Sequence, residues 1–256
     1  MNRHNNIFVT LDWLRNNINN PDVVIIDTRN KLLYNHNHII NSVSISVEQV
    51  IKISNNGAHL VLDVQNLSIF FSNCGIDLNK TVVICGDYLD PAMARIAWTL
   101  FYSGHQRIKL LNAGITNLDK SLMITTNSMP KIKKTTFVSN TNDMLRITTN
   151  ELKNNLDNFV ILDARSIPEY MHSHLPKAIS APFSDGIHSN SFQNKQFLTQ
   201  MFEDKKINLN DEIVCYCTHG HRASSLFLQL MYVGYNKIKL YDGSFVDWTA
   251  QHLETE

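Results

Sequence analysis

The fold is decided by the stretch Val214-Cys215-Tyr216-Cys217-Thr218-His219-Gly220-His221-Arg222-Ala223-Ser224-Ser225. A short apolar run, Glu212 to Tyr216, predicts a buried strand, and Arg222 to Val233 has apolar residues at helical spacing. Gly234 is a natural end for that helix, and a second strand is predicted over Lys237 to Tyr241. Strand–helix–strand units with such short connections are right-handed crossovers between parallel strands.

Upstream of this unit, the sequence predicts further elements of the same kind. Val160 to Leu162 is a β-branched run ended by Asp163, which is typical of a buried strand. Thr149-Asn150 predicts the start of a capped helix, and a second helix is predicted over Phe192 to Phe202. The expected fold class is therefore α/β, with a parallel sheet flanked by helices. In such sheets the functional site lies beyond the carboxyl ends of the strands.

The chain contains an internal repeat. With a shift of 130 positions, residues 81–118 align with 211–248 without a gap, and Cys85 falls on Cys215. With a shift of 136, the run Val24 to Arg29 falls on Val160 to Arg165. Two collinear blocks with matching polar residues predict two tandem copies of one domain.

The repeat predicts a domain over residues 5–120, a linker over 121–145 and a second domain over 146–254. The linker carries Pro130 and a basic run from Lys131 to Lys134, which we interpret as a solvated surface. In the gapless alignment the counterpart of Cys217 is Asp87. We therefore expect the first copy to be catalytically inactive and to form a wall of the active-site cleft.

Composition excludes several classes of protein. Lys plus Arg (23) equals Asp plus Glu (23) in the 256 residues, which argues against a nucleic-acid or anionic-membrane partner. The chain has no stretch of about 18 apolar residues, and its first residues lack the apolar core of a signal peptide. A cytoplasmic location is thus expected, and a monomer is the default expectation.

The four cysteines do not predict a disulfide framework or a metal site. They are too few and too unevenly spaced for the former. Cys215 and Cys217 form one C-x-C pair, but a zinc site needs two further ligands at matched spacing. No metal and no cofactor is therefore expected. We interpret Cys74, Cys85 and Cys215 as core residues.

Cys217 is the candidate nucleophile. The loop from Thr218 to the helix start is so short that its backbone N–H groups must converge near the strand end, which favours an anion. The helix dipole and Arg222 add positive charge, and His219 and His221 can add more. Because helix N-termini and nearby cations favour the thiolate, we expect Cys217 to be mostly ionised at neutral pH.

The chain resembles the tandem rhodanese family over nearly its whole length. The resemblance rests on several motifs in combination and on the pairing of an Asp-bearing first domain with a Cys-bearing second one. The motifs are the Asp163-x-Arg165 strand end, the His174-x-Pro176-x-Ala178 segment, the six-residue loop that starts at Cys217, and the Tyr241-Asp242-Gly243-Ser244 turn followed by Trp248.

This resemblance implies two tandem rhodanese-like domains and a thiosulfate sulfurtransferase that works through a Cys217 persulfide. The implied partners are a small-molecule sulfur donor and an acceptor such as cyanide or a thiol. Asp163 and Arg165 are expected to support the loop. The residues implied in substrate binding are those of the loop, with Arg222 attracting the anionic donor: Thr218, His219, Gly220, His221 and Arg222.

Three alternatives remain open. His221-Arg222 is similar to the loop end of bacterial thiosulfate enzymes, whereas Glu169 stands where animal enzymes place a substrate-binding Arg. A 3-mercaptopyruvate sulfurtransferase is the nearest enzymatic rival. A Cys-dependent phosphatase needs a longer loop than the four residues between Cys217 and Arg222. A non-enzymatic sulfur-relay or binding module is the third alternative, although retention of both these residues argues against it.

Overall fold

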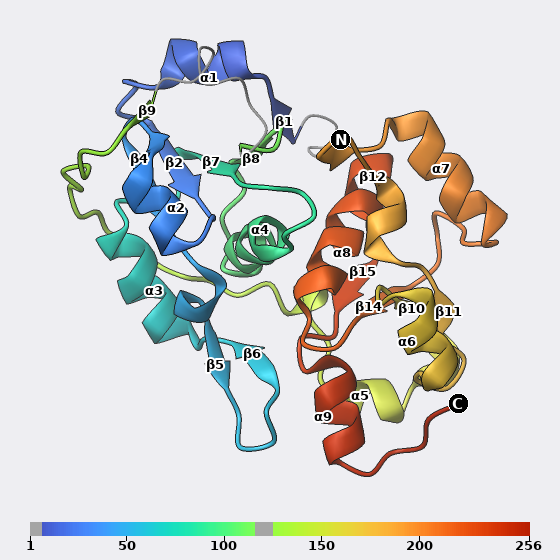
Figure 1. Ribbon diagram of the computed structural model, residues 1–256. Helices are drawn as coiled ribbons and strands as arrows, with labels where there is room; N and C mark the ends of the chain where they lie inside the picture. The colour runs from blue at the N-terminus through green and yellow to red at the C-terminus, as the bar shows by residue number, and fades with distance from the viewer. Residues whose placement is uncertain (1–6, 116–124) are drawn as a thin grey trace. The chain divides into compact units, whose positions relative to one another are not determined.

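The computed structural model describes residues 7–115 and 125–256, which form two compact units (Figure 1). Of the described residues, the N-terminal unit holds 7–50 together with Leu62–Thr141. The C-terminal unit holds Ile51–Val61 together with Asn142–Glu256. The short segment Ile51–Val61 thus lies within the expected first domain by sequence, but it belongs to the unit built by the second copy. Positions 5, 6 and 116–124 of the expected domain and linker lie outside the described residues.

The C-terminal unit is built on a four-stranded parallel sheet. Its strand order is β11-β10-β14-β15, and every pair of neighbours is parallel, which confirms the predicted fold class. Hydrogen-bonded register places Cys215, in the middle of the sheet, beside Leu162 on one side and Leu240 on the other. The strands are β11 (Ile179–Ser180), β10 (Val160–Asp163), β14 (Ile213–Tyr216) and β15 (Ile238–Leu240).

Helices cover both faces of this sheet. Val214 and Tyr216 of β14 share one face and pack in a core with Leu152 and Trp248, whereas α8 packs against β14 and β15. The helices of this unit are α5 (Thr149–Lys153), α6 (Ile167–His172), α7 (Lys195–Asp204), α8 (His221–Val233) and α9 (Ser244–Ala250). Thr148 caps α5 in a capping box with Glu151.

One predicted helix begins later than expected. Phe192 lies in the two-stranded pair β12 (Ile187–His188) and β13 (Ser191–Phe192), and α7 starts only at Lys195. The reason is local, because the Asn194 side chain accepts from the Phe197 N–H and caps the helix there.

The N-terminal unit repeats this architecture with one more strand. Its five-stranded sheet has the order β1-β8-β7-β2-β4, again parallel throughout. The sheet consists of β1 (Phe8–Val9), β8 (Ile108–Leu111), β7 (Thr81–Cys85), β2 (Val23–Asp27) and β4 (Ser42–Ser44), and the helices are α1 (Leu11–Asn17), α2 (Lys31–His36), α3 (Val64–Asn73) and α4 (Ala92–Tyr102). A further pair is formed by β3 (His38–Ile39) and β9 (Thr125–Thr126).

The described part of the expected linker packs on the N-terminal unit up to Thr141. The Phe137 N–H donates to Ser72 Oγ at 2.8 Å, and the Phe137 ring lies edge-on against Phe71 with the ring centroids 5.2 Å apart. These contacts tie the segment to α3.

Strand register shows which residues of the two copies are equivalent. In the N-terminal sheet Asp27 pairs with Cys85, and in the C-terminal sheet Asp163 pairs with Tyr216. Asp27 and Asp163 occupy the same place in the repeat, so Cys85 corresponds to Tyr216. Strand β7 therefore aligns with β14 at a sequence shift that is one position larger than the shift of 130, which aligns the helices and strands that follow them.

The counterpart of Cys217 is accordingly Gly86, and the prediction that Asp87 takes this place is wrong. Backbone hydrogen bonds agree, because Ile115 N donates to Gly86 O at 3.2 Å and Phe245 N donates to Cys217 O at 3.0 Å. The loop after the strand is one residue longer in the first copy, and a gapless alignment hides this because apolar residues match on both sides of it.

A β-hairpin from the first copy completes the C-terminal unit. It consists of the antiparallel strands β5 (Ile51–Ile53) and β6 (His59–Val61) (Figure 1). The Val61 N–H donates to Asp242 Oδ2 at 2.9 Å, and Asn56 Nδ2 donates to Asp247 Oδ1 at 2.7 Å. These bonds fix the hairpin beside the turn that leads into α9.

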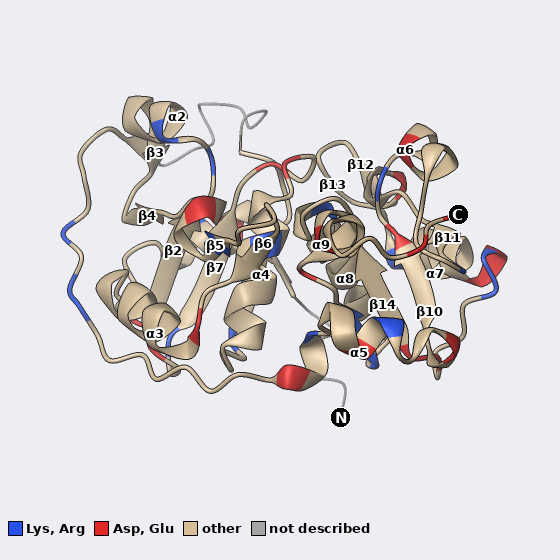
Figure 2. Ribbon diagram, turned by 90° about the horizontal axis from the view of Figure 1, so that it is seen from below, with Lys and Arg blue, Asp and Glu red and all other residues tan. Residues whose placement is uncertain are grey.

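Within the described ranges, no helix combines the length and the apolar character needed to cross a membrane. Basic and acidic segments are interspersed along both units (Figure 2).

Candidate active site

Cys217 lies at the carboxyl end of β14, at the start of a tight loop. Its side chain is buried, with 1% of the residue exposed. Gly220 has φ of 80°, a left-handed conformation that glycine adopts without steric cost, and α8 begins at the next residue. This turn directs the Gly220 N–H at Cys217 Sγ, with N and S 3.1 Å apart. A backbone donor at a helix start thus meets the sulfur, as the sequence predicted.

The start of α9 holds the backbone of this loop. Ser244 Oγ accepts from the Cys217 N–H at 3.2 Å, and the Phe245 N–H donates to Cys217 O at 3.0 Å. The Val246 N–H donates to Thr218 O at 3.2 Å. The Tyr241-Asp242-Gly243-Ser244 turn noted in the sequence therefore leads into residues that fix the backbone of the loop through hydrogen bonds.

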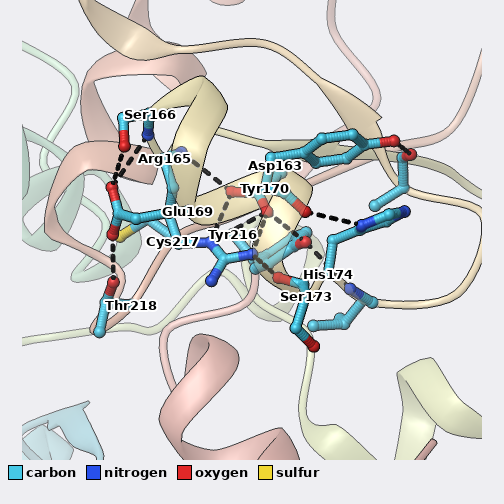
Figure 3. Close-up of polar contacts among 12 residues, drawn as sticks. Asp163, Arg165, Ser166, Glu169, Tyr170, Ser173, His174, Tyr216, Cys217 and Thr218 are labelled. Carbon is cyan, nitrogen blue, oxygen red and sulfur yellow. Dashed lines mark hydrogen bonds and ion pairs between the residues drawn. The ribbon is translucent and has the colours of Figure 1, made fainter. Parts of the chain in front are cut away.

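Asp163 and Arg165 form a buried ion pair beside the loop, with Arg165 Nη2 2.6 Å from Asp163 Oδ2 (Figure 3). Arg165 Nη2 also donates to Ser173 O at 2.6 Å, and Tyr216 Oη donates to Asp163 Oδ2 at 2.5 Å. Burial opposes the charge of Arg165, but the bonds to Asp163 outweigh it and raise the pKa of the guanidinium. The Arg165 guanidinium stacks over the Phe245 ring at 4.1 Å. That these two residues support the loop stays a prediction.

Arg222 lies in the first turn of α8, where its guanidinium is shared among several groups. Its Nη2 donates to Thr218 Oγ1 at 2.7 Å, which binds the two ends of the loop together. Its two terminal nitrogens also contact the Glu169 carboxylate, at 2.7 and 2.8 Å. The hydrogen bond to Glu169 raises the pKa of Arg222, burial opposes this, and the charge of Cys217 raises it further. The cation thus faces both the thiol and a carboxylate.

The two loop histidines meet a third one that the sequence did not single out. His59, from the hairpin, stacks on His219 with the ring centroids 4.3 Å apart, and its Nδ1 lies 3.2 Å from His221 Nε2. Burial, followed by the charges of His59 and Arg222, lowers the pKa of His219. His219 Nδ1 is buried and finds no hydrogen-bond partner among the described residues. No local pattern marks His59, because it is 162 residues from His221.

The other three thiols are buried, Cys74 and Cys85 in the N-terminal unit and Cys215 within β14, as their interpretation as core residues requires. Burial raises the pKa of Cys74 to about 12, and burial is also the largest cause that raises the pKa values of Cys85 and Cys215. Raised pKa values keep these three thiols protonated at neutral pH, so none of them is suited to thiolate chemistry.

Packing explains why a thiol stands in only one copy. A Cβ built on Gly86 would come within 2.2 Å of Thr28 Oγ1, so no side chain fits there without displacing Thr28. In the C-terminal unit the place of Thr28 is taken by Ala164, which has no hydroxyl. The smaller neighbour leaves room for the Cys217 side chain.

Comparison with known proteins agrees with this architecture. The chain is 23% identical over 269 residues to the thiosulfate sulfurtransferase of Corynebacterium glutamicum, covering 96% of this chain and 88% of that protein. It is 20% identical over 267 residues to the 3-mercaptopyruvate sulfurtransferase of Escherichia coli, covering 95% of each. Its fold matches the crystal structure of SseA from Escherichia coli, a 3-mercaptopyruvate sulfotransferase, with a TM-score of 0.85 and 20% identity over 94% of this chain and 99% of that one.

The profile of the rhodanese-like domain matches the chain twice, over residues 10–121 and 148–251. These two matches span most of the sequence and coincide with the two sheets. The protein therefore belongs to the rhodanese family, with two rhodanese-like domains in tandem.

Proposed function

We propose that the protein is a sulfurtransferase that takes the outer sulfur of thiosulfate onto Cys217 and passes it to cyanide or a thiol acceptor. The observation that carries this proposal is the Gly220 N–H, which donates to Cys217 Sγ at the start of α8, beside the Arg222 cation. Donors in this position favour a negative sulfur, both as thiolate and as persulfide.

In the first step the Cys217 thiolate attacks the outer sulfur of thiosulfate. A sulfur–sulfur bond forms to Cys217, the sulfur–sulfur bond of thiosulfate breaks, and sulfite leaves with the electron pair. In the second step cyanide attacks the terminal sulfur, giving thiocyanate and the free thiolate. Covalent catalysis of this kind predicts ping-pong kinetics.

Intact-mass spectrometry tests the proposal. Incubation with thiosulfate is expected to add about 32 Da, one sulfur atom, and cyanide is expected to remove it. The adduct should be missing in Cys217→Ser and should persist in Cys74→Ser, which removes a thiol of the other unit. Absence of an adduct in the wild-type protein would refute the enzyme and favour a binding module.

3-Mercaptopyruvate is the second candidate donor, because a relative of similar sequence identity is named for it. The chemistry at Cys217 would be the same, with pyruvate as the leaving product. Steady-state kcat/KM values for the two donors distinguish the candidates. We expect the larger value for thiosulfate, and a larger value for 3-mercaptopyruvate would replace the first proposal by the second.

A further inference from the structure

Arg222, the cation that faces the Cys217 thiol, forms an ion pair with Glu169. The two carboxylate oxygens contact the two terminal nitrogens of the guanidinium separately, at 2.7 and 2.8 Å. Bidentate pairs of this kind are stronger and more directional than single contacts. The side chains are 26% and 38% exposed, so small ions from solvent can reach them.

Glu169 is held from its other side by the start of α6. Its Oε2 accepts from the Ser166 N–H at 3.0 Å and from Ser166 Oγ at 2.7 Å, in a capping box (Figure 3). The carboxylate therefore has a fixed position independent of Arg222, since a capping box restrains the residue at the third helical position.

Glu169 is also a permanent charge. The hydrogen bond from Arg222 is the largest cause that holds the pKa of Glu169 far below its usual range; burial opposes this, and the Ser166 bonds add to it. Its negative charge cancels that of Arg222, and the lowered pKa of His219 favours the neutral imidazole. The surroundings of the thiol thus carry little net positive charge for a dianion such as thiosulfate.

We infer that Glu169 is the specificity-determining residue of the donor step, an internal carboxylate with which an anionic donor competes for Arg222. This inference rests on the proposed function. Because the capping box holds Glu169 in place, an anion that takes over Arg222 leaves that carboxylate unpaired beside it, so the competition weakens donor binding without altering the attack of Cys217 on sulfur. The effect belongs in the KM for the donor and not in kcat.

The variant Glu169→Gln tests the inference, because glutamine keeps the capping box and the shape of the side chain but removes the charge. We expect the KM for thiosulfate to fall about tenfold, with kcat changed by less than about threefold. The inhibition constant of sulfate, an unreactive dianion that would compete for the same cation, should fall in parallel.

The chain offers a matched control in Glu151. Its Oε2 accepts from the Thr148 N–H at 2.8 Å and from Thr148 Oγ1 at 2.6 Å, which is the same capping box without a bond to Arg222. Glu151→Gln should therefore leave the KM for thiosulfate unchanged. If Glu169→Gln fails to fold, Glu169→Asp keeps a carboxylate too short to reach both nitrogens, and its KM should fall by a smaller factor.

The outcomes separate the inference from the function on which it rests. A persulfide adduct in both proteins with KM values within about twofold overturns the role of Glu169 alone. A fall in kcat with unchanged KM overturns it too, because the charge would then act on the chemical step. Absence of the adduct from wild type and variant at saturating thiosulfate overturns the proposed function itself.

Discussion

Gly86 lies against Thr28 so closely that a Cβ on Gly86 would come within 2.2 Å of Thr28 Oγ1. The hydroxyl is held there by a hydrogen bond that it donates to Cys85 O at 3.2 Å. The two equivalent positions of the C-terminal unit are Cys217 and Ala164. The residue that follows the strand-end Asp in each copy, Thr28 or Ala164, therefore limits the room for a side chain at Gly86 or Cys217.

Ala164→Thr is expected to disable the thiol. The added hydroxyl would meet the Cys217 side chain as Thr28 would meet a side chain at Gly86. Overpacking of this kind costs about 1–3 kcal/mol, measured as a shift in urea unfolding. The persulfide adduct should be lost or strongly reduced in intact mass. Thr28→Ala, the reverse change in the other copy, serves as the control and should keep the adduct; full adduct formation in Ala164→Thr would contradict this packing argument.

The same contact predicts coupling in the N-terminal unit. Gly86→Cys alone should destabilise the protein, and Thr28→Ala should relieve most of that loss in the double variant. Two residues in contact of this kind show interaction energies of about 0.5–3 kcal/mol in a double-mutant cycle. Additive effects would mean that the thiol finds room by another route.

Asp163→Ala is expected to be severe, because it leaves the buried Arg165 guanidinium without its carboxylate. Removing one partner of a buried ion pair costs about 3–5 kcal/mol. Tyr216→Phe removes a hydroxyl bonded to the same carboxylate but keeps the ion pair, and should cost about 1–3 kcal/mol. Equal losses in urea unfolding for the two variants would show that the ion pair adds nothing beyond the hydrogen bond.

Stability should depend on pH through His219. Its pKa is lowered in the folded protein, first by burial, so between the lowered value and about 6.5 the unfolded chain binds more protons than the folded one. The free energy of unfolding therefore rises with pH across this window, and this contribution to stability disappears as the pH falls through it. Urea midpoints from about pH 5 to pH 8 should show the slope in wild type and a smaller slope in His219→Gln.

The control for that titration is His188→Gln, a change on an exposed strand end. It should leave the slope unchanged. A second check is the imidazole resonance of His219 in His59→Gln, where the pKa should move up toward its ordinary value because one of the causes that lower it is gone. An unmoved resonance would assign the shift to burial and Arg222 alone.

Local periodicity accounts for the part of the fold that was predictable. The strand–helix–strand unit around Cys217 was predicted within a residue or two at its ends, since apolar spacing, Gly234 and the Asp242-Gly243 turn all act over short distances. The geometry of the loop was predictable for the same reason, because a short loop between a strand and a helix leaves few arrangements; that its residues bind a substrate stays a prediction.

The remaining features depend on contacts between distant residues or on a single extra residue. The sequence did not reveal the extra residue in the loop after Gly86, because the apolar residues of the two copies match before and after that loop even without a gap in the alignment. The contact between Glu169 and Arg222 was missed because it joins residues that are 53 positions apart in the sequence. His59 lies on a hairpin whose packing partner is encoded in the other copy.

That hairpin has a consequence for how the chain is made. The ribosome synthesises His59 162 residues before its partner His221, and domains generally begin to fold in the order of synthesis. The N-terminal sheet can therefore assemble before the hairpin partners Asp242 and Asp247 have been synthesised. His219 and His221 can meet His59 only when nearly all of the protein has been synthesised, and a gene fragment that encodes the second copy alone would yield a loop without this third histidine.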